Sequence, residues 1–194
     1  MVIGITGGIG AGKSVVSRIL RCKGFEVYDC DREARLLMDA SAEVKDAIAG
    51  RFGAECLFED GSLNRAQIAS YVFTDEGHRR WLNSIVHSMV HTVLETRIRQ
   101  SRSEPFFVES AILRTSGLES ICDEIWLVDA PESVRLERAA DRDAVDPAKI
   151  RCRMEAQAFE FEGFGNKVKV ICNDGINPLI PQIDSLLMRY IENH

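Results

Sequence analysis

Residues Gly7 to Ser14 read GGIGAGKS, which fits the pattern Gly-x-x-x-x-Gly-Lys-Ser of a phosphate-binding loop. The short apolar run VIGIT (Val2 to Thr6) comes directly before this loop. VVSRIL (Val15 to Leu20), with apolar residues at helical spacing, comes directly after it. A strand, a glycine loop and a helix in that order are the context that a P-loop requires. This context favours a P-loop over a chance glycine-rich turn.

The residue types in this loop suit the binding of a nucleoside triphosphate. Glycines let the backbone turn its N–H groups inward around a polyphosphate, and the helix that begins near Gly12 adds its positive N-terminal end. The Lys13 ammonium can reach the β- and γ-phosphates, and the Ser14 hydroxyl can ligate Mg²⁺. We therefore predict that the chain binds ATP or GTP.

The composition is that of an ordinary globular protein, and it narrows the range of partners. With 194 residues, 45% of them hydrophobic and 28% charged, the chain can form one well-packed domain with small insertions. The net charge of −6 does not suggest a nucleic-acid or membrane-surface role, and no apolar run has the length of a membrane span. The N-terminus lacks the layout of a signal peptide, so we expect a cytoplasmic location.

Five short apolar runs indicate the buried strands of a parallel sheet. Segments with helical periodicity separate these runs, which is typical of an α/β fold. Together with the glycine loop they predict a three-layer P-loop nucleoside-triphosphate-binding fold with a five-stranded parallel sheet. The runs are Val2–Thr6, Phe25–Tyr28, Phe106–Val108, Ile125–Val128 and Val168–Cys172.

The uneven spacing of these runs indicates two insertions. About 75 residues separate the second run from the third, and within them Trp81 to Leu94 carries an apolar stripe at helical spacing. We therefore predict a mostly helical insertion over residues 36–100. A charge-rich insertion over residues 132–164 contains Asp146-Pro147, which is typical of a helix start, and we expect two short helices there. The core then comprises residues 1–35, 101–131 and 165–194.

Asp29 and Asp31 follow the second predicted strand, at the edge of the sheet where ligands bind in open α/β folds. Strand alternation would place both carboxylates on one side of the strand. A carboxylate there can accept a proton from an attacking hydroxyl or help to hold Mg²⁺ through water. A solvated acidic turn or a helix N-cap is an equally supported alternative.

Arg138 and Arg142 lie four residues apart, so on a helix they would share one face, with Arg135 nearby. On a mobile flap over ATP, such arginines can neutralise charge on the phosphoryl group during transfer. The alternative is a solvated face on which they pair with acidic neighbours such as Asp141 and Asp143. Beside a P-loop we favour the first interpretation, in which residues 132–164 form a lid.

Three further patterns argue against other functions. His87 and His91 have the spacing of a zinc-binding helix, but Ser88 stands where that motif requires glutamate. The six cysteines include no Cys-x-x-Cys pair, which predicts reduced, mostly buried thiols. Asn166 to Lys169 reads NKVK, and Lys169 cannot accept the hydrogen bonds of guanine, which argues against a GTP switch protein.

Seven segments in order resemble the dephospho-CoA kinase family over nearly the whole chain. The opening ITGGIGAGKS and the following VYDCDREAR are similar to that family's glycine loop and its Asp-x-Asp-x-x-Ala-Arg region. RFGAECLFEDGSLNRAQIASYVF and RWLNSIVH resemble the next two segments, the second of which contains Leu-Asn-x-x-x-His. LERAADRD, RMEAQ and ICNDG resemble the lid and the late Ile-x-Asn-x-Gly strand end.

The resemblance implies a kinase that uses ATP and Mg²⁺ to phosphorylate the ribose 3′-hydroxyl of dephospho-CoA. It implies that Lys13, Arg138 and Arg142 serve catalysis. It also implies that Asp31 is the base or orienter of the hydroxyl. Ser14 would hold Mg²⁺, partly through water. We expect the helical insertion to bind dephospho-CoA, and the enzyme to be a monomer or weak homo-oligomer with neither nucleic-acid nor membrane partners. The expected acceptor contacts are Asp31, Arg35, His87 and Gln157, and the expected ATP contacts are Gly8, Ile9, Gly10, Ala11, Gly12, Lys13, Ser14, Val15, Arg142, Asn173 and Gly175.

Two places depart from the family pattern. Ser88 replaces the proline that follows the histidine, and residues 111–115 read AILRT in place of Pro-Leu-Leu-Phe-Glu. Glu109, at the end of the third predicted strand, is a candidate for a carboxylate near the metal. Two alternatives stay open: another P-loop kinase with a nucleoside or sugar acid as acceptor, and a regulatory NTPase.

Overall fold

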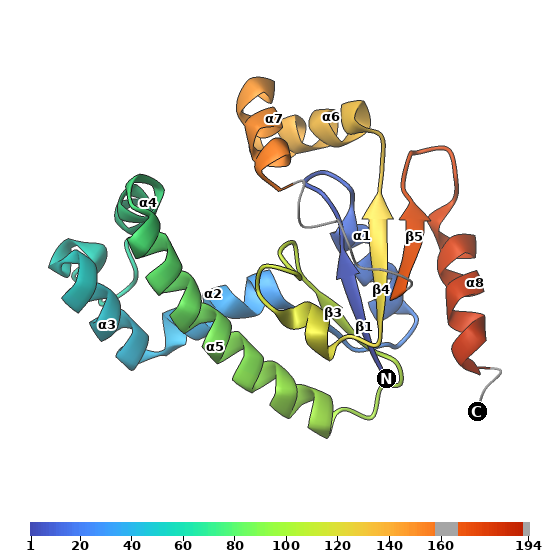
Figure 1. Ribbon diagram of the computed structural model, residues 1–194, viewed down its shortest axis with the longest axis horizontal. Coiled ribbons are helices and arrows are strands. Elements are labelled where there is room, and N and C mark those ends of the chain that lie inside the picture. The colour runs from blue at the N-terminus through green and yellow to red at the C-terminus, as the bar shows by residue number, and fades with distance from the viewer. Residues whose placement is uncertain (158–166, 192–194) are drawn as a thin grey trace. The chain divides into compact units, whose positions relative to one another are not determined.

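The computed structural model describes residues 1–157 and 167–191. Its five-stranded sheet is parallel and has the order β2-β3-β1-β4-β5 (Figure 1). The predicted α/β P-loop fold is therefore confirmed, although β2 begins two residues later than expected. The strands are β1 (Val2–Thr6), β2 (Val27–Asp29), β3 (Phe106–Glu109), β4 (Glu124–Asp129) and β5 (Val168–Cys172).

One face of the sheet is covered by helices α1 (Lys13–Cys22) and α8 (Leu179–Ile191) (Figure 1). Ile3 and Ile5 alternate along β1 and pack against this layer, where they meet Leu20 of α1. All three side chains are fully buried, and each such burial stabilises the fold by about 1.5–3 kcal/mol. This packing holds α1, and with it the glycine loop, against the sheet.

The segment that follows β3, which includes the 3₁₀ helix η2 (Leu118–Ile121), covers the opposite face. Gly4 of β1 points toward this segment. A Cβ on Gly4 would lie 2.8 Å from Leu113 Cδ2 and 2.9 Å from Cys122 Sγ. Because the central strands are buried on both faces, their sequences read as continuous apolar runs rather than alternating ones.

The chain divides into two compact units, Met1–Asp29 with Gln100–His194, and Cys30–Arg99. The second unit, called here the helical unit, falls within the long segment between β2 and β3. Whether residues 36–100 form the acceptor-binding insertion stays a prediction. The elements of this segment are α2 (Cys30–Ala40), α3 (Ala42–Phe52), the 3₁₀ helix η1 (Ala54–Cys56), α4 (Arg65–Thr74) and α5 (Glu76–Gln100).

The core of the helical unit is built around aromatic rings. Phe52 stacks on Tyr71 with ring centroids 5.5 Å apart, and it meets Trp81 edge-on at 5.2 Å. Such pairs add about 0.5–1.5 kcal/mol each to the burial of their area. The first part of the apolar stripe predicted on α5 packs against this core, through Trp81, Leu82, Ile85, Val86 and Met89.

Helices α6 (Glu132–Asp143) and α7 (Pro147–Ala156) follow β4 and are the two short helices predicted there. The Asp146 carboxylate accepts a hydrogen bond from the backbone at the start of α7 and caps that helix, as its sequence indicates. Part of the predicted lid, residues 158–164, lies outside the described residues, as does Asn166. The lid role of residues 132–164 stays a prediction.

No described helix combines the length and the apolar character needed to cross a membrane. All six cysteines are free. The expectation of mostly buried thiols fits only half of the six cysteines. Two of the others lie on α1 and α7 and are exposed. Cys30, Cys56 and Cys122 are buried, Cys172 is intermediate, and Cys22 and Cys152 are exposed.

Candidate functional site

Close contacts that only glycine permits shape the loop between β1 and α1. Gly10 and Gly12 have φ angles of 78° and 96°, in the left-handed region that disfavours side chains. A Cβ on Gly10 would lie 2.1 Å from the Arg135 carbonyl oxygen. A Cβ on Gly12 would lie 2.1 Å from Asn173 Nδ2. Glycine at both positions therefore lets α6 and the end of β5 approach the loop.

Lys13 and Ser14 are the first two residues of α1, directly after the loop. Gly12, the N-cap residue, has no side chain to cap this helix, so the positive helix end faces the loop with its N–H groups available to an anion. Lys13 Nζ donates a 2.6 Å hydrogen bond to the Gly7 carbonyl oxygen, which holds the ammonium across the loop. This arrangement suits a bound polyphosphate.

Glu109 brings a buried carboxylate to the carboxyl end of the sheet. It pairs with Ile5 of β1 and Asp29 of β2, and only 7% of it is exposed. Its Oε2 has no hydrogen-bond partner among the described residues. Burial raises the pKa of Glu109, the nearby Ser17 hydroxyl lowers it in part, and the Asp29 carboxylate raises it further. A cation at this edge would stabilise the charged form of Glu109.

Asp31 lies on a helix, which corrects the prediction made from strand alternation. β2 ends at Asp29 and α2 begins at Cys30, so Asp31 is in the first turn of α2. Successive side chains of a helix are rotated by about 100°, so the two-residue period of a strand does not apply there. The N-cap alternative is wrong as well, because α2 has already begun at Cys30, one residue before Asp31. Asp31 is exposed, as is Arg35 one turn later on α2.

The two arginines predicted to act from the lid have different surroundings. Arg138 Nη1 donates a 2.8 Å hydrogen bond to the Asn173 carbonyl oxygen and so ties α6 to the end of β5. Arg142 pairs with its neighbour Asp143 through two hydrogen bonds of 2.7 and 3.1 Å. These bonds from Arg142 hold the pKa of Asp143 below its usual range. The surroundings of Arg142 therefore match the solvated-face alternative, whereas Arg138 reaches the end of β5.

Arg135 is the arginine of α6 that lies against the glycine loop, and sequence reasoning did not single it out. Its Nη1 lies 2.2 Å from the point that a Cβ on Gly8 would occupy. Its Nε donates a 3.0 Å hydrogen bond to the Ala130 carbonyl oxygen, which orients the guanidinium. The available signal was its position one helical turn before Arg138. A charge pattern alone does not tell which arginine meets the loop.

Asn173, at the end of β5, also contacts the glycine loop. Its Nδ2 donates a 2.7 Å hydrogen bond to the Ala11 carbonyl oxygen, and its backbone N–H donates one of 2.7 Å to the Asp129 carbonyl oxygen. Asp174 accepts hydrogen bonds from the backbone N–H groups two and three residues later, and these lower its pKa. Gly175, with φ of 87°, completes this turn. Contact of Asn173 and Gly175 with adenine stays a prediction.

Gln157 and His87 are the remaining expected acceptor contacts. Gln157 is the C-cap residue of α7, and its side-chain amide bonds to the backbone of Ile9 and Ala111. His87 lies on α5 in the helical unit and is half-buried. Burial lowers the pKa of His87, and the neighbouring His91 lowers it further. For both residues, contact with the acceptor stays a prediction.

Oxygen donors near the loop fit a magnesium ion. Mg²⁺ prefers oxygen ligands and keeps several waters, usually beside one or two carboxylates and the phosphates of its substrate. The Ser14 hydroxyl and the partnerless Glu109 Oε2 are donors of this kind. Within residues 1–157 and 167–191, no three His, Cys, Asp or Glu side chains form a metal-binding group. The donor set therefore suits an ion that arrives with a nucleotide.

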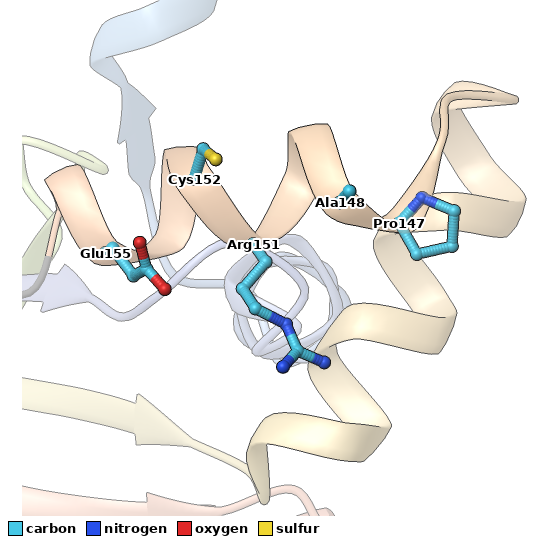
Figure 2. Close-up of a pocket in the computed structure, with 5 residues that line it drawn as sticks. All are labelled: Pro147, Ala148, Arg151, Cys152 and Glu155. Carbon is cyan, nitrogen blue, oxygen red and sulfur yellow. The ribbon is translucent and has the colours of Figure 1, made fainter.

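An open hollow of about 430 Å³ lies along α7 (Figure 2). All of its lining residues come from that one helix, and none of them is among the predicted site residues. The candidate site is therefore the glycine loop with its neighbours rather than this hollow. The lining residues are Pro147, Ala148, Arg151, Cys152 and Glu155.

Known proteins resemble the chain over nearly its full length. A dephospho-CoA kinase of Porphyromonas gingivalis is 42% identical over 160 residues, which cover 82% of this chain and 79% of that protein. One of Methylococcus capsulatus is 33% identical over 191 residues, which cover 98% of this chain and 96% of that protein. The solved structure of TT1252 from Thermus thermophilus matches with a TM-score of 0.82 at 29% identity and covers 97% of both chains. Because the dephospho-CoA kinase family model also matches residues 1–177, this chain belongs to that family.

Proposed function

We propose that this chain transfers the γ-phosphoryl group of ATP to the ribose 3′-hydroxyl of dephospho-CoA, giving coenzyme A and ADP. Membership of the dephospho-CoA kinase family carries this proposal. The acceptor oxygen forms a bond to the γ-phosphorus while the bond from that phosphorus to the β,γ-bridging oxygen breaks. The hydroxyl proton must leave during this step. Such transfer depends on positioning and on neutralisation of charge rather than on covalent chemistry of the protein.

The phosphates of ATP lie in the glycine loop in this proposal. Backbone N–H groups of the loop that are not already bonded within the protein, together with the positive end of α1, face their oxygens. Lys13 exchanges its hydrogen bond with the Gly7 carbonyl oxygen for one to the β- and γ-phosphates. Arg138 supplies positive charge from α6. Arg142 can do so only after it leaves Asp143, to which it is bonded.

The acceptor hydroxyl is oriented by Asp31, which also takes its proton. Arg35, one turn along the same helix, and His87 on α5 bind other parts of dephospho-CoA. Asn173 and Gly175 form the adenine end of the ATP site, where the Asn173 side chain already meets the loop at Ala11.

Mg²⁺ would be held by the Ser14 hydroxyl, partly through water, and the Glu109 carboxylate would supply negative charge near the ion. Bound Mg²⁺ neutralises charge on the β- and γ-phosphates. The buried, partnerless Oε2 of Glu109 supports this role, because a carboxylate so placed gains from a nearby cation.

Formation of ADP from Mg-ATP, measured with and without dephospho-CoA, tests the function. We expect ADP to form only with the acceptor, and the acceptor product to gain one phosphate by mass. ADP formed equally well without acceptor would indicate an NTPase instead. ATP binding without any stimulation by dephospho-CoA would show that the acceptor is wrong while the P-loop assignment stands.

Asp31→Asn tests the role of the carboxylate. We expect turnover to fall by about 10²- to 10⁴-fold, since the amide cannot take the hydroxyl proton, while ATP affinity changes little. Asp39→Asn on the same helix is the matched control. Turnover within a few-fold of the unsubstituted enzyme would remove Asp31 from catalysis.

A further inference from the structure

Ile9, in the middle of the glycine loop, is anchored in the helix pair α6–α7. Its side chain packs against the small apolar cluster of Ala139, Ile150 and Met154. Ala139 and Ile150 are fully buried, so this cluster forms a defined surface rather than a loose contact. The phosphate-binding loop and the two helices therefore share one piece of hydrophobic core.

Gln157 closes the same junction with hydrogen bonds. Its Oε1 accepts a 3.2 Å hydrogen bond from the Ile9 backbone N–H. Its Nε2 donates a 2.8 Å hydrogen bond to the Ala111 carbonyl oxygen, in the segment that follows β3. One amide at the end of α7 thus bridges the loop and the stretch that departs from the family pattern. Both polar ends of this side chain are engaged by backbone.

We infer that Gln157 is a positioning residue for ATP, which sets the glycine loop through Ile9 instead of binding the acceptor. This inference rests on the proposed function, in which the loop holds the phosphates. An amide is suited to the task, because it offers an acceptor for the Ile9 N–H and a donor for the Ala111 carbonyl at once.

The physical gain lies in preorganisation. A loop that is already held in its binding shape loses less conformational entropy when the phosphates arrive. Arg135 contacts the same turn of the loop from α6, since a Cβ on Gly8 would meet its Nη1 and one on Gly10 its carbonyl oxygen. With Arg135 on one side and Gln157 on the other, α6 and α7 hold the loop together.

The test compares Gln157→Met, which keeps the length but neither hydrogen bond, with Gln157→Glu, which keeps the acceptor for the Ile9 N–H. For Gln157→Met we expect a KM for ATP about 5- to 10-fold higher, the scale of one or two lost hydrogen bonds, with the KM for dephospho-CoA changed less than about twofold. Hydrogen exchange at the Ile9 amide should speed up by about the same factor without any ligand. Gln157→Glu should keep that amide protected.

Cys152→Ala, a neutral change on the exposed side of α7, is the matched control and should alter neither KM. A higher KM for dephospho-CoA with unchanged ATP affinity would overturn the inference and return Gln157 to the acceptor site. Unchanged Ile9 exchange in Gln157→Met would overturn it as well. The exchange measurement needs no substrate, so it decides on Gln157 even if the unsubstituted protein fails to phosphorylate dephospho-CoA.

Discussion

The glycine loop and the core of the helical unit are stabilised in different ways. In the loop, a Cβ at Gly10 or Gly12 would come within 2.1 Å of a neighbouring atom, and hydrogen bonds from Asn173 and to Gln157 reach its backbone. In the helical unit, Phe52 and Trp81 are held by packing of apolar area. The shape of the loop therefore depends on backbone geometry at single positions, whereas the stability of the helical core depends on the total volume of its packed side chains.

This difference explains why the loop has a strict glycine motif and the apolar core of the helical unit does not. Close backbone approach admits only glycine, so the loop has a sequence motif with glycine at fixed positions. A packed core accepts many apolar residues of similar volume, so the core positions of α5 show only a periodic apolar stripe.

The largest expected effect comes from Lys13→Ala. Removal of the ammonium from the loop should lower the transfer rate by about 10³-fold or more, since Lys13 is the cation that is held across the loop by the Gly7 carbonyl oxygen. Steady-state ADP release in the presence of dephospho-CoA measures it. Lys23→Ala, at the other end of α1 where Lys23 pairs with Asp184, should retain most activity. A Lys13→Ala rate within tenfold of the unsubstituted enzyme would contradict the phosphate role.

The helical unit should be most sensitive at Phe52, which is 5% exposed. Phe52→Ala is expected to destabilise that unit by about 3–5 kcal/mol, because it removes the ring that stacks on Tyr71 and leaves a cavity. Urea unfolding followed by circular dichroism measures the loss. Phe73→Ala, at a ring that is 88% exposed, should cost less than about 0.5 kcal/mol. We expect Phe52→Ala to impair transfer more than ATP binding, and equal loss of both would show that the two units unfold together.

Glu109→Gln should make the protein more stable in the absence of Mg-nucleotide. Burial raises the pKa of Glu109 above its ordinary value of 4.5, so the folded state favours the protonated acid. The stability that the protonated Glu109 side chain contributes to the folded state is fully present below about pH 4.5. It is lost as the pH rises through the folded-state pKa of Glu109. At pH 7 the variant should therefore melt about 2–4 °C higher, with the difference vanishing near pH 4. Calorimetry across this range checks it, and a lower Tm at pH 7 would refute the argument.

The smallest effect contrasts two glycines. Gly50 lies inside α3, and a Cβ there would meet nothing within 4 Å, so Gly50→Ala should stabilise the helical unit by about 0.5–1 kcal/mol. Gly12→Ala, by contrast, should weaken both folding and ATP binding, because the added methyl group meets Asn173 at a φ of 96°. Thermal unfolding and ATP titration of the two variants side by side test this. A neutral Gly12→Ala would mean that the loop is more adaptable than its contacts indicate.

Local patterns predicted the five strands, the helical character of the segments between them and the position of Lys13 and Ser14 at the start of α1. They failed at Asp31, where the strand gives way to α2 directly after Asp29. Alternation and helical periodicity cannot be told apart over three residues, so the face of that carboxylate was not predictable. They also gave no reason to choose Arg135 over Arg138 as the arginine beside the loop, since both lie on one helix one turn apart.

By itself the sequence determined the class of fold, the phosphate loop and the family, because these depend on residues that are neighbours in the chain or that recur in a fixed order. The tertiary structure alone decided what surrounds the loop. The hydrogen bond between Ile9 and Gln157 joins residues 148 positions apart, and the Asn173 side chain meets Ala11 across 162 positions. Such contacts arise from the order of strands in the sheet and from the close approach that glycine permits, and no local pattern encodes either.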